Sequence, residues 1–239
     1  MIRTLKAMLL ASMALAVFGA LAASSAHAAD EERFHCEAEP CKFKALPDEV
    51  VNTKTSHHVF IVDNAGESVS FTCDQLSGNG TSAKKTAFEL ELENIVYGSG
   101  APGACKVNGS TGITVKMNGC KYNFTVTNAF IATGNEDANV TITGCEAGKS
   151  IEIVYETGCV ATIPAQAPLK GINFHNVPKG ELMTVETNIK GITVHFVGTK
   201  AQCLITPTGT PEGTYTTGNT FVTGEEDKVG GAMKAVWFE

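Results

Sequence analysis

The stretch that decides the fold is residues 113–127, ITVKMNGCKYNFTVT. Apolar and polar side chains alternate over residues 113–117, and a period of two is that of a β-strand with one buried and one wetted face. Asn118-Gly119 follows, a pair that favours a two-residue hairpin turn because both central positions need positive φ. The alternation resumes over residues 121–126. We therefore expect two strands that form a hairpin at this turn.

The same alternation recurs on both sides of this stretch, and residues rich in Gly, Asn, Ser and Thr separate the runs. We expect residues 75–85 to form such a loop. Strands are expected at residues 57–63, 67–73, 86–97, 139–143, 151–155, 160–163, 171–175, 182–189, 191–197, 213–223 and 232–238. The fold class is all-β, a disulfide-braced antiparallel β-sandwich or flattened barrel of about a dozen short strands.

Residues 1–28 have the pattern of a bacterial signal peptide. A basic start with Arg3 and Lys6 precedes an apolar run over residues 8–21, and Ala26-His27-Ala28 matches the cleavage pattern. No later run approaches the ~20 apolar residues of a transmembrane helix. We expect a secreted or cell-envelope protein.

The rest of the chain divides at a change in composition. Residues 29–56 are polar and mixed, and we expect a loosely structured N-terminal segment held by Cys36 and Cys41. Residues 57–239 form the β-domain, and the prolines within 164–170 leave a subdivision into two smaller units open.

The charge of the chain excludes some partners. The formal net charge is −7, and removing Arg3 and Lys6 with the signal leaves 16 basic and 25 acidic residues, a charge of −9. An acidic exported protein is poorly suited to nucleic acid or anionic lipid.

All eight cysteines follow the signal segment, and an even number in an exported chain favours four disulfides. If residues 120–127 and 138–145 pair as antiparallel strands, Cys120 lies opposite Cys145 at a separation that suits a disulfide. The other expected pairs only follow sequence order: Cys36–Cys41, Cys73–Cys105 and Cys159–Cys203.

The sequence offers few groups for catalysis or metal binding. Glu89, Glu91 and Glu93 share one strand face, and paired carboxylates can hydrolyse glycosides, although a solvated acidic face is the simpler interpretation. His57 and His58 should point to opposite faces of a strand, so they do not easily share one metal with each other. One of them could still join His175 or His195 across the sheet, but isolated strand histidines are more often ordinary surface or core residues. Acidic loops at residues 135–137 and 225–227 could hold Ca²⁺ only weakly. We expect no cofactor, catalytic residue or metal site.

Four segments resemble a group of exported, cysteine-containing β-proteins that soil actinobacteria encode in multiple copies. These segments are residues 117–124 (MNGCKYNF), 145–153 (CEAGKSIEI), 159–166 (CVATIPAQ) and 213–218 (GTYTTG). The resemblance covers residues 60–223 and rests on turns and cysteines. It implies a β-fold and supplies no catalytic residue. Members often lack the Cys36/Cys41 pair.

These observations favour a non-enzymatic secreted or envelope β-protein with a structural or binding role. Its Thr-, Asn- and Gly-rich loops suit contacts with a cell surface or a glycan. The alternative is a secreted carbohydrate-acting hydrolase that uses strand or loop carboxylates, with Glu91 and Glu93 among them.

Overall fold

A computed structural model describes residues 34–36, 39–46, 57–82, 86–99, 103–127, 135–176, 183–224 and 236–238. They form eighteen strands and one short helix, and every strand pairing is antiparallel. All of them belong to the compact unit Glu32–Glu239. The all-β, antiparallel expectation is confirmed, with more strands than the dozen expected. The expected signal peptide lies outside the described residues.

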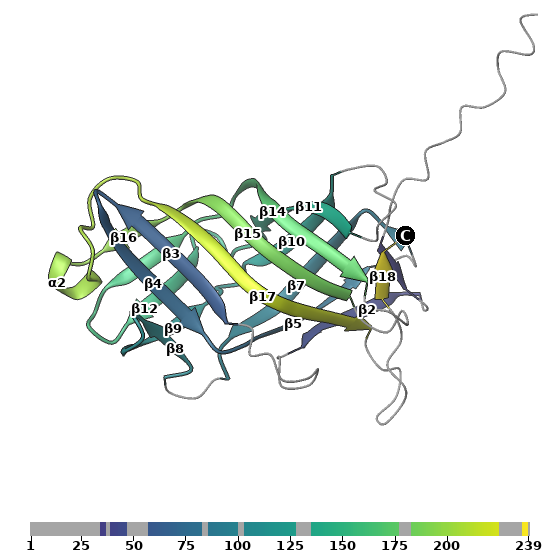
Figure 1. The fold of residues 1–239 in the computed structure, drawn as a ribbon, viewed down its shortest axis with the longest axis horizontal. Coiled ribbons are helices and arrows are strands. Elements are labelled where there is room, and N and C mark those ends of the chain that lie inside the picture. Colours follow the sequence, from purple (N-terminus) through teal and green to yellow (C-terminus); the bar gives the residue numbers. More distant parts are fainter. Residues whose placement is uncertain are drawn as a thin grey trace, which may run out of the picture. The chain divides into compact units, whose positions relative to one another are not determined.

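Strand β17 (Glu212–Gly224) is shared by two arms of one 15-stranded sheet, and it crosses between β3 and β15 in Figure 1. The first arm runs from β17 through β2 (Cys41–Leu46), β5 (Leu76–Ser82), β7 (Glu89–Tyr97), β10 (Lys121–Val126), β11 (Asn135–Thr143) and β14 (Gln166–Asn176) to β15 (Met183–Thr193). Because β15 also pairs with β17, these eight strands close into a ring. A closed ring of eight strands has an interior wide enough for side chains or one small ligand.

The second arm leaves β17 on the β3 side. It runs through β3 (His58–Asn64), β4 (Glu67–Cys73), β8 (Cys105–Val107), β9 (Thr111–Lys116), β12 (Ile151–Tyr155) and β13 (Val160–Ile163) to β16 (His195–Val197). Only Val194 separates β15 from β16, so both arms end on one continuous segment. Residues 164 and 165 carry the chain from β13 of the second arm to β14 of the first. The position considered for a subdivision is thus a crossing between the arms.

A separate three-stranded sheet consists of β18 (Val236–Phe238), β1 (Phe34–Cys36) and β6 (Thr86–Ala87). β18 packs beside β14, β15 and β17, and the Phe34 ring meets Phe174 of β14 edge-on with centroids 5.0 Å apart. The expectation of a loosely structured segment over residues 29–56 is therefore wrong for β1 and β2. In β2 the buried Phe43 and Ala45 alternate with exposed lysines, which is the pattern of a sheet strand.

The Asn118-Gly119 turn forms, but the expected hairpin is wrong. Asn118 and Gly119 have φ of 49° and 76°, and the Cys120 N–H donates to the Met117 carbonyl at 2.9 Å. The strands on either side nevertheless separate, because β9 pairs with β8 and β12 whereas β10 pairs with β7 and β11. Alternation determines which face a strand buries, and it leaves the neighbouring strand undetermined.

The register of β10 against β11 differs by one residue from the expected one. Lys121 lies opposite Thr143, so the Cys120–Cys145 disulfide joins residues just beyond the paired strands, with Cα atoms 3.8 Å apart. This register places Tyr122 opposite Ile142, so that side chains on the same face of the sheet meet. A slip of one residue would pair inward with outward positions.

Residues 75–85 were expected to form a loop, yet residues 76–82 form β5. Gly80 makes this strand possible. A Cβ atom there would lie 2.0 Å from the Glu91 carbonyl oxygen and 2.2 Å from Cζ of Phe43. The glycine therefore lets the Phe43 ring lie directly over the backbone.

Four disulfides join the cysteines in the same pairs that sequence order suggested: Cys36–Cys41, Cys73–Cys105, Cys120–Cys145 and Cys159–Cys203. The first ties β1 to β2 and the second ties β4 to β8. The fourth ties the residue before β13 to helix α2 (Lys200–Cys203), which begins at a Thr199 capping box. Each contributes about 2–4 kcal/mol to stability by constraining the unfolded chain.

Candidate ligand-binding cavity

The two arms of the sheet surround a partly open cavity of about 130 Å³ that is lined by side chains of both arms. Most of the lining is aliphatic or aromatic, including Ile153 of β12, Phe174 of β14 and Val185 of β15. None of the described residues that line it is an aspartate, glutamate, lysine or arginine. Apolar cavities of about 150 Å³ in protein cores stay dry and accept molecules as small as benzene. The cavity is therefore suited to a small apolar molecule.

Four polar aromatic side chains interrupt this apolar lining. Nδ1 of His58 and the Tyr215 hydroxyl lie 2.6 Å apart, and the Tyr97 and Tyr122 hydroxyls lie 2.9 Å apart. The two pairs adjoin, because the Tyr97 ring meets His58 and Tyr215 edge-on at centroid distances of 5.8 and 6.5 Å. We call His58, Tyr97, Tyr122 and Tyr215 the aromatic tetrad.

Cross-strand pairing places two further polar residues, Thr217 and Thr187, in a row with His58 of the tetrad. His58 of β3 lies opposite Thr217 of β17, and Thr217 lies opposite Thr187 of β15. All three line the cavity. The hydroxyl of Thr187 is buried and has no hydrogen-bond partner. A buried hydroxyl without a partner costs free energy.

The tetrad tyrosines are half-buried, although protein surrounds them. Tyr97, Tyr122 and Tyr215 all line the cavity, and part of the surface of each remains accessible. These side chains are therefore available to a molecule in the cavity.

Burial keeps the tetrad uncharged at neutral pH. Loss of hydration, with a smaller effect from His57, lowers the pKa of His58 to about 4. Burial likewise raises the pKa of Tyr97, Tyr122 and Tyr215 far above that of a free phenol. The tetrad consequently presents neutral hydrogen-bonding groups and no ionised acid or base at pH 7.

The sequence predicted one feature of this site and missed the rest. His57 and His58 do occupy opposite faces of the strand, since His58 is 4% exposed and His57 is fully on the surface side. The signal for His58 was its position two residues before the buried Phe60 and four before the buried Val62, on the inward face of the strand. The tyrosines come from three other strands, so no local motif joins them to His58.

The candidate hydrolase carboxylates lie on the sheet face opposite the buried Leu90 and Leu92. Nζ of Lys121 contacts Glu91 at 2.7 Å and Glu93 at 3.0 Å, and the Glu89 carboxylate accepts from Asn123. The hydrogen bond with Glu91 raises the pKa of Lys121. These carboxylates take part in cross-strand pairs and do not line the cavity.

The other candidate ligands are dispersed. Nε2 of His175 lies 3.5 Å from Glu186, and Asp137 accepts a hydrogen bond from Asn173. Residues 225–227 lie outside the described part of the chain. Within that part, no three histidine, cysteine, aspartate or glutamate side chains lie close enough to hold a metal ion. No helix formed by the described residues is long and apolar enough to cross a membrane.

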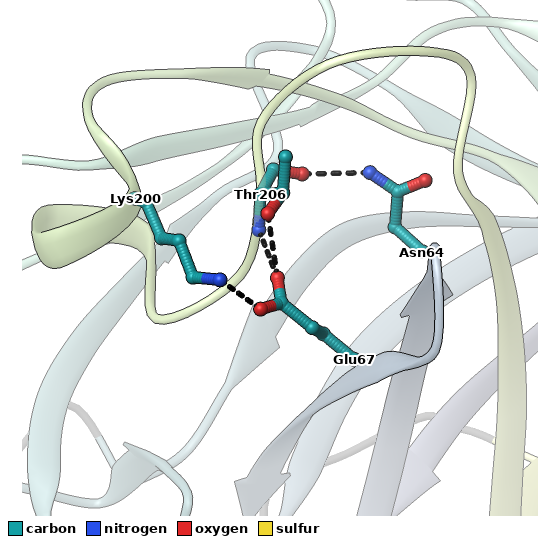
Figure 2. Close-up of polar contacts among 4 residues, drawn as sticks. All are labelled: Asn64, Glu67, Lys200 and Thr206. Atoms are coloured by element: carbon teal, nitrogen blue, oxygen red, sulfur yellow. Dashed lines mark hydrogen bonds and ion pairs between the residues drawn. The ribbon is translucent and has the colours of Figure 1, made fainter.

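A second polar cluster fastens the turn of the β3–β4 hairpin to helix α2 and the loop after it (Figure 2). Glu67 pairs with Lys200 and accepts from the backbone and the hydroxyl of Thr206, both at 2.7 Å. Asn64 donates to the carbonyls of Thr206 and Thr208. The Glu67 carboxylate and the Asn64 amide both find their partners within the protein. The cluster is therefore a structural clamp between the hairpin turn and the segment that contains helix α2.

Replacing Glu67 by glutamine should lower the melting temperature at neutral pH and change its dependence on acid. The hydrogen bond from Lys200 and those from Thr206 lower the pKa of Glu67 to about 2 from 4.5. The stabilisation is therefore complete above about pH 4.5 and is lost as pH falls through about 2. Melting curves between pH 2 and 7 for wild type, Glu67→Gln and the exposed control Glu146→Gln measure it. Equal acid profiles for wild type and Glu67→Gln would contradict the clamp.

Comparison with protein-family models, with curated proteins and with solved structures yields no match.

Proposed function

We propose that this is an exported, non-catalytic β-protein that binds one small, mostly apolar molecule inside its sheet. The observation that carries the proposal is the uncharged cavity with a polar tetrad on its wall. Binding sites of this kind combine an apolar lining with a few placed hydrogen-bonding groups. Export is supported by the signal pattern of residues 1–28 and by four disulfides, which persist in oxidising compartments.

Hydrolysis of carbohydrate has less in its favour. The Lys121 ammonium engages both Glu91 and Glu93 on the outer face, and a glycan needs a polar cleft with a carboxylate on each side of the bond. A place in the cell envelope or at a glycan surface is compatible with the proposed binding role and stays a prediction.

Titration of the oxidised protein with toluene and with acetophenone tests the proposal, with the isoleucine, leucine and valine methyl resonances as the readout. Saturable shifts confined to cavity-lining methyls are expected. Val115→Phe should fill the cavity and abolish them. Val154→Phe is the matched control, because Val154 is half-buried on the neighbouring strand and does not line the cavity. Absence of saturable shifts with both probes would overturn the proposal.

A further inference from the structure

The hydrogen-bonding capacity of the tetrad is incompletely used. Each of its three phenols carries one exchangeable proton, and a neutral imidazole carries one more. The two hydrogen bonds, His58 with Tyr215 and Tyr97 with Tyr122, use one proton each. Even a third bond, between Tyr97 and Tyr215, would leave one proton without an acceptor inside the tetrad. Whichever way the hydroxyls rotate, at least one donor has no acceptor within the tetrad.

A donor that faces an apolar cavity is unfavourable unless an acceptor reaches it. The three tyrosines line the cavity and are only half-buried, so part of their surface is accessible there. An acceptor atom of a bound molecule can therefore accept a hydrogen bond from a tetrad donor.

The uncharged lining of the cavity disfavours ionic ligands. Among the described residues the lining holds no cationic side chain to pair with a carboxylate and no anionic one to pair with an ammonium. An unpaired ion moved from water into such an interior costs far more than one hydrogen bond returns. Burial also keeps His58 neutral at pH 7 by lowering its pKa to about 4.

From these observations, and resting on the proposed binding function, we infer that the cavity selects a neutral molecule that carries an acceptor oxygen on an apolar frame. Ketones, aldehydes, esters and ethers are of this class. The oxygen accepts a hydrogen bond from the tetrad. Its apolar part lies among the aliphatic and aromatic side chains of the two arms. Carboxylates, including fatty-acid anions, and ammonium compounds are rejected.

Four probes of similar shape test this inference at pH 7: acetophenone, cumene, benzoate and 1-phenylethylammonium. The carbonyl stretch of bound acetophenone should shift to lower wavenumber than in an alkane solvent, because the oxygen accepts a hydrogen bond. Benzoate and 1-phenylethylammonium should bind at least about tenfold more weakly than acetophenone. A tenfold difference in affinity corresponds to about the net free energy of one hydrogen bond. A stretch at the alkane value, or equal affinity for either ion, would overturn the inference.

Variants of the tetrad test whether its members donate the hydrogen bond to the bound oxygen. Replacement of all four tetrad members by phenylalanine (His58→Phe, Tyr97→Phe, Tyr122→Phe and Tyr215→Phe) should return the stretch to the alkane value. Tyr155→Phe is the matched control, because it removes a buried hydroxyl that has no partner and does not line the cavity. A shift retained without the tetrad would overturn the assignment. If the fourfold variant does not fold, the wild-type spectrum and the charge series still decide.

The two proposals fail differently. Binding of cumene and acetophenone without a carbonyl shift leaves the apolar binding function standing and removes the acceptor-oxygen selectivity. Failure of every probe to bind removes the binding function itself.

Discussion

Replacement of Phe174 by alanine should lower the free energy of unfolding by about 3–5 kcal/mol, the cost typical of truncating a buried phenylalanine. Phe174 is 1% exposed and meets the Phe34 and Phe124 rings edge-on, with centroids 5.0 and 5.7 Å away. It thereby joins the three-stranded sheet to the ring of the first arm. Its loss removes both ring contacts and enlarges a cavity that the remaining side chains only partly refill.

Urea unfolding of the oxidised protein measures this loss, provided that the m-value is unchanged. Phe88→Ala is the matched control. Phe88 is 42% exposed, so its truncation should cost less than about 1 kcal/mol. A cost below about 1 kcal/mol for Phe174→Ala as well would show that Phe174 is not a packed contact between the two sheets.

Acidification should produce the second large effect, through His58. Its pKa falls from 6.5 in the unfolded chain to about 4 in the folded protein, so the unfolded state binds more protons between these values. The free energy of unfolding is therefore unaffected above pH 6.5 and declines as pH falls toward 4. At 1.36 kcal/mol for each pKa unit, the decline is ~3 kcal/mol.

Unfolding measured every half pH unit from 7 to 4 tests this effect. His58→Phe should remove the decline, because no proton is then taken up at this position. His195→Gln, which changes an exposed histidine on β16, should retain it. If wild type and His58→Phe lose the same stability over this range, His58 does not carry the pH dependence.

The positions of most strands follow from the sequence, because alternation records directly which side chains meet the core. The runs at residues 57–63 and 67–73 became β3 and β4, and Ala65 and Gly66 form the turn between them with positive φ. β5 was missed because its glycines and asparagine resemble a loop. The Phe43 ring that makes Gly80 necessary comes from a strand far away in the chain.

Strand partners and the cavity could not be predicted from alternation alone. The chain passes repeatedly between the two arms, for example at Asn118-Gly119 and at residues 164 and 165, and neither of these sites differs in composition from an ordinary turn. The tetrad depends on these crossings. Its side chains come from β3, β7, β10 and β17. Three half-buried tyrosines and a buried histidine become one site only because these strands surround the same interior.

The most direct test of the binding account is a set of intermolecular nuclear Overhauser effects between bound acetophenone and the methyl groups of the oxidised protein. The account predicts contacts from the acetophenone ring to Ile153, Val185 and Ile189, which line the cavity. Contacts confined to exposed methyls such as those of Val197, or no contacts at a saturating concentration, would contradict it.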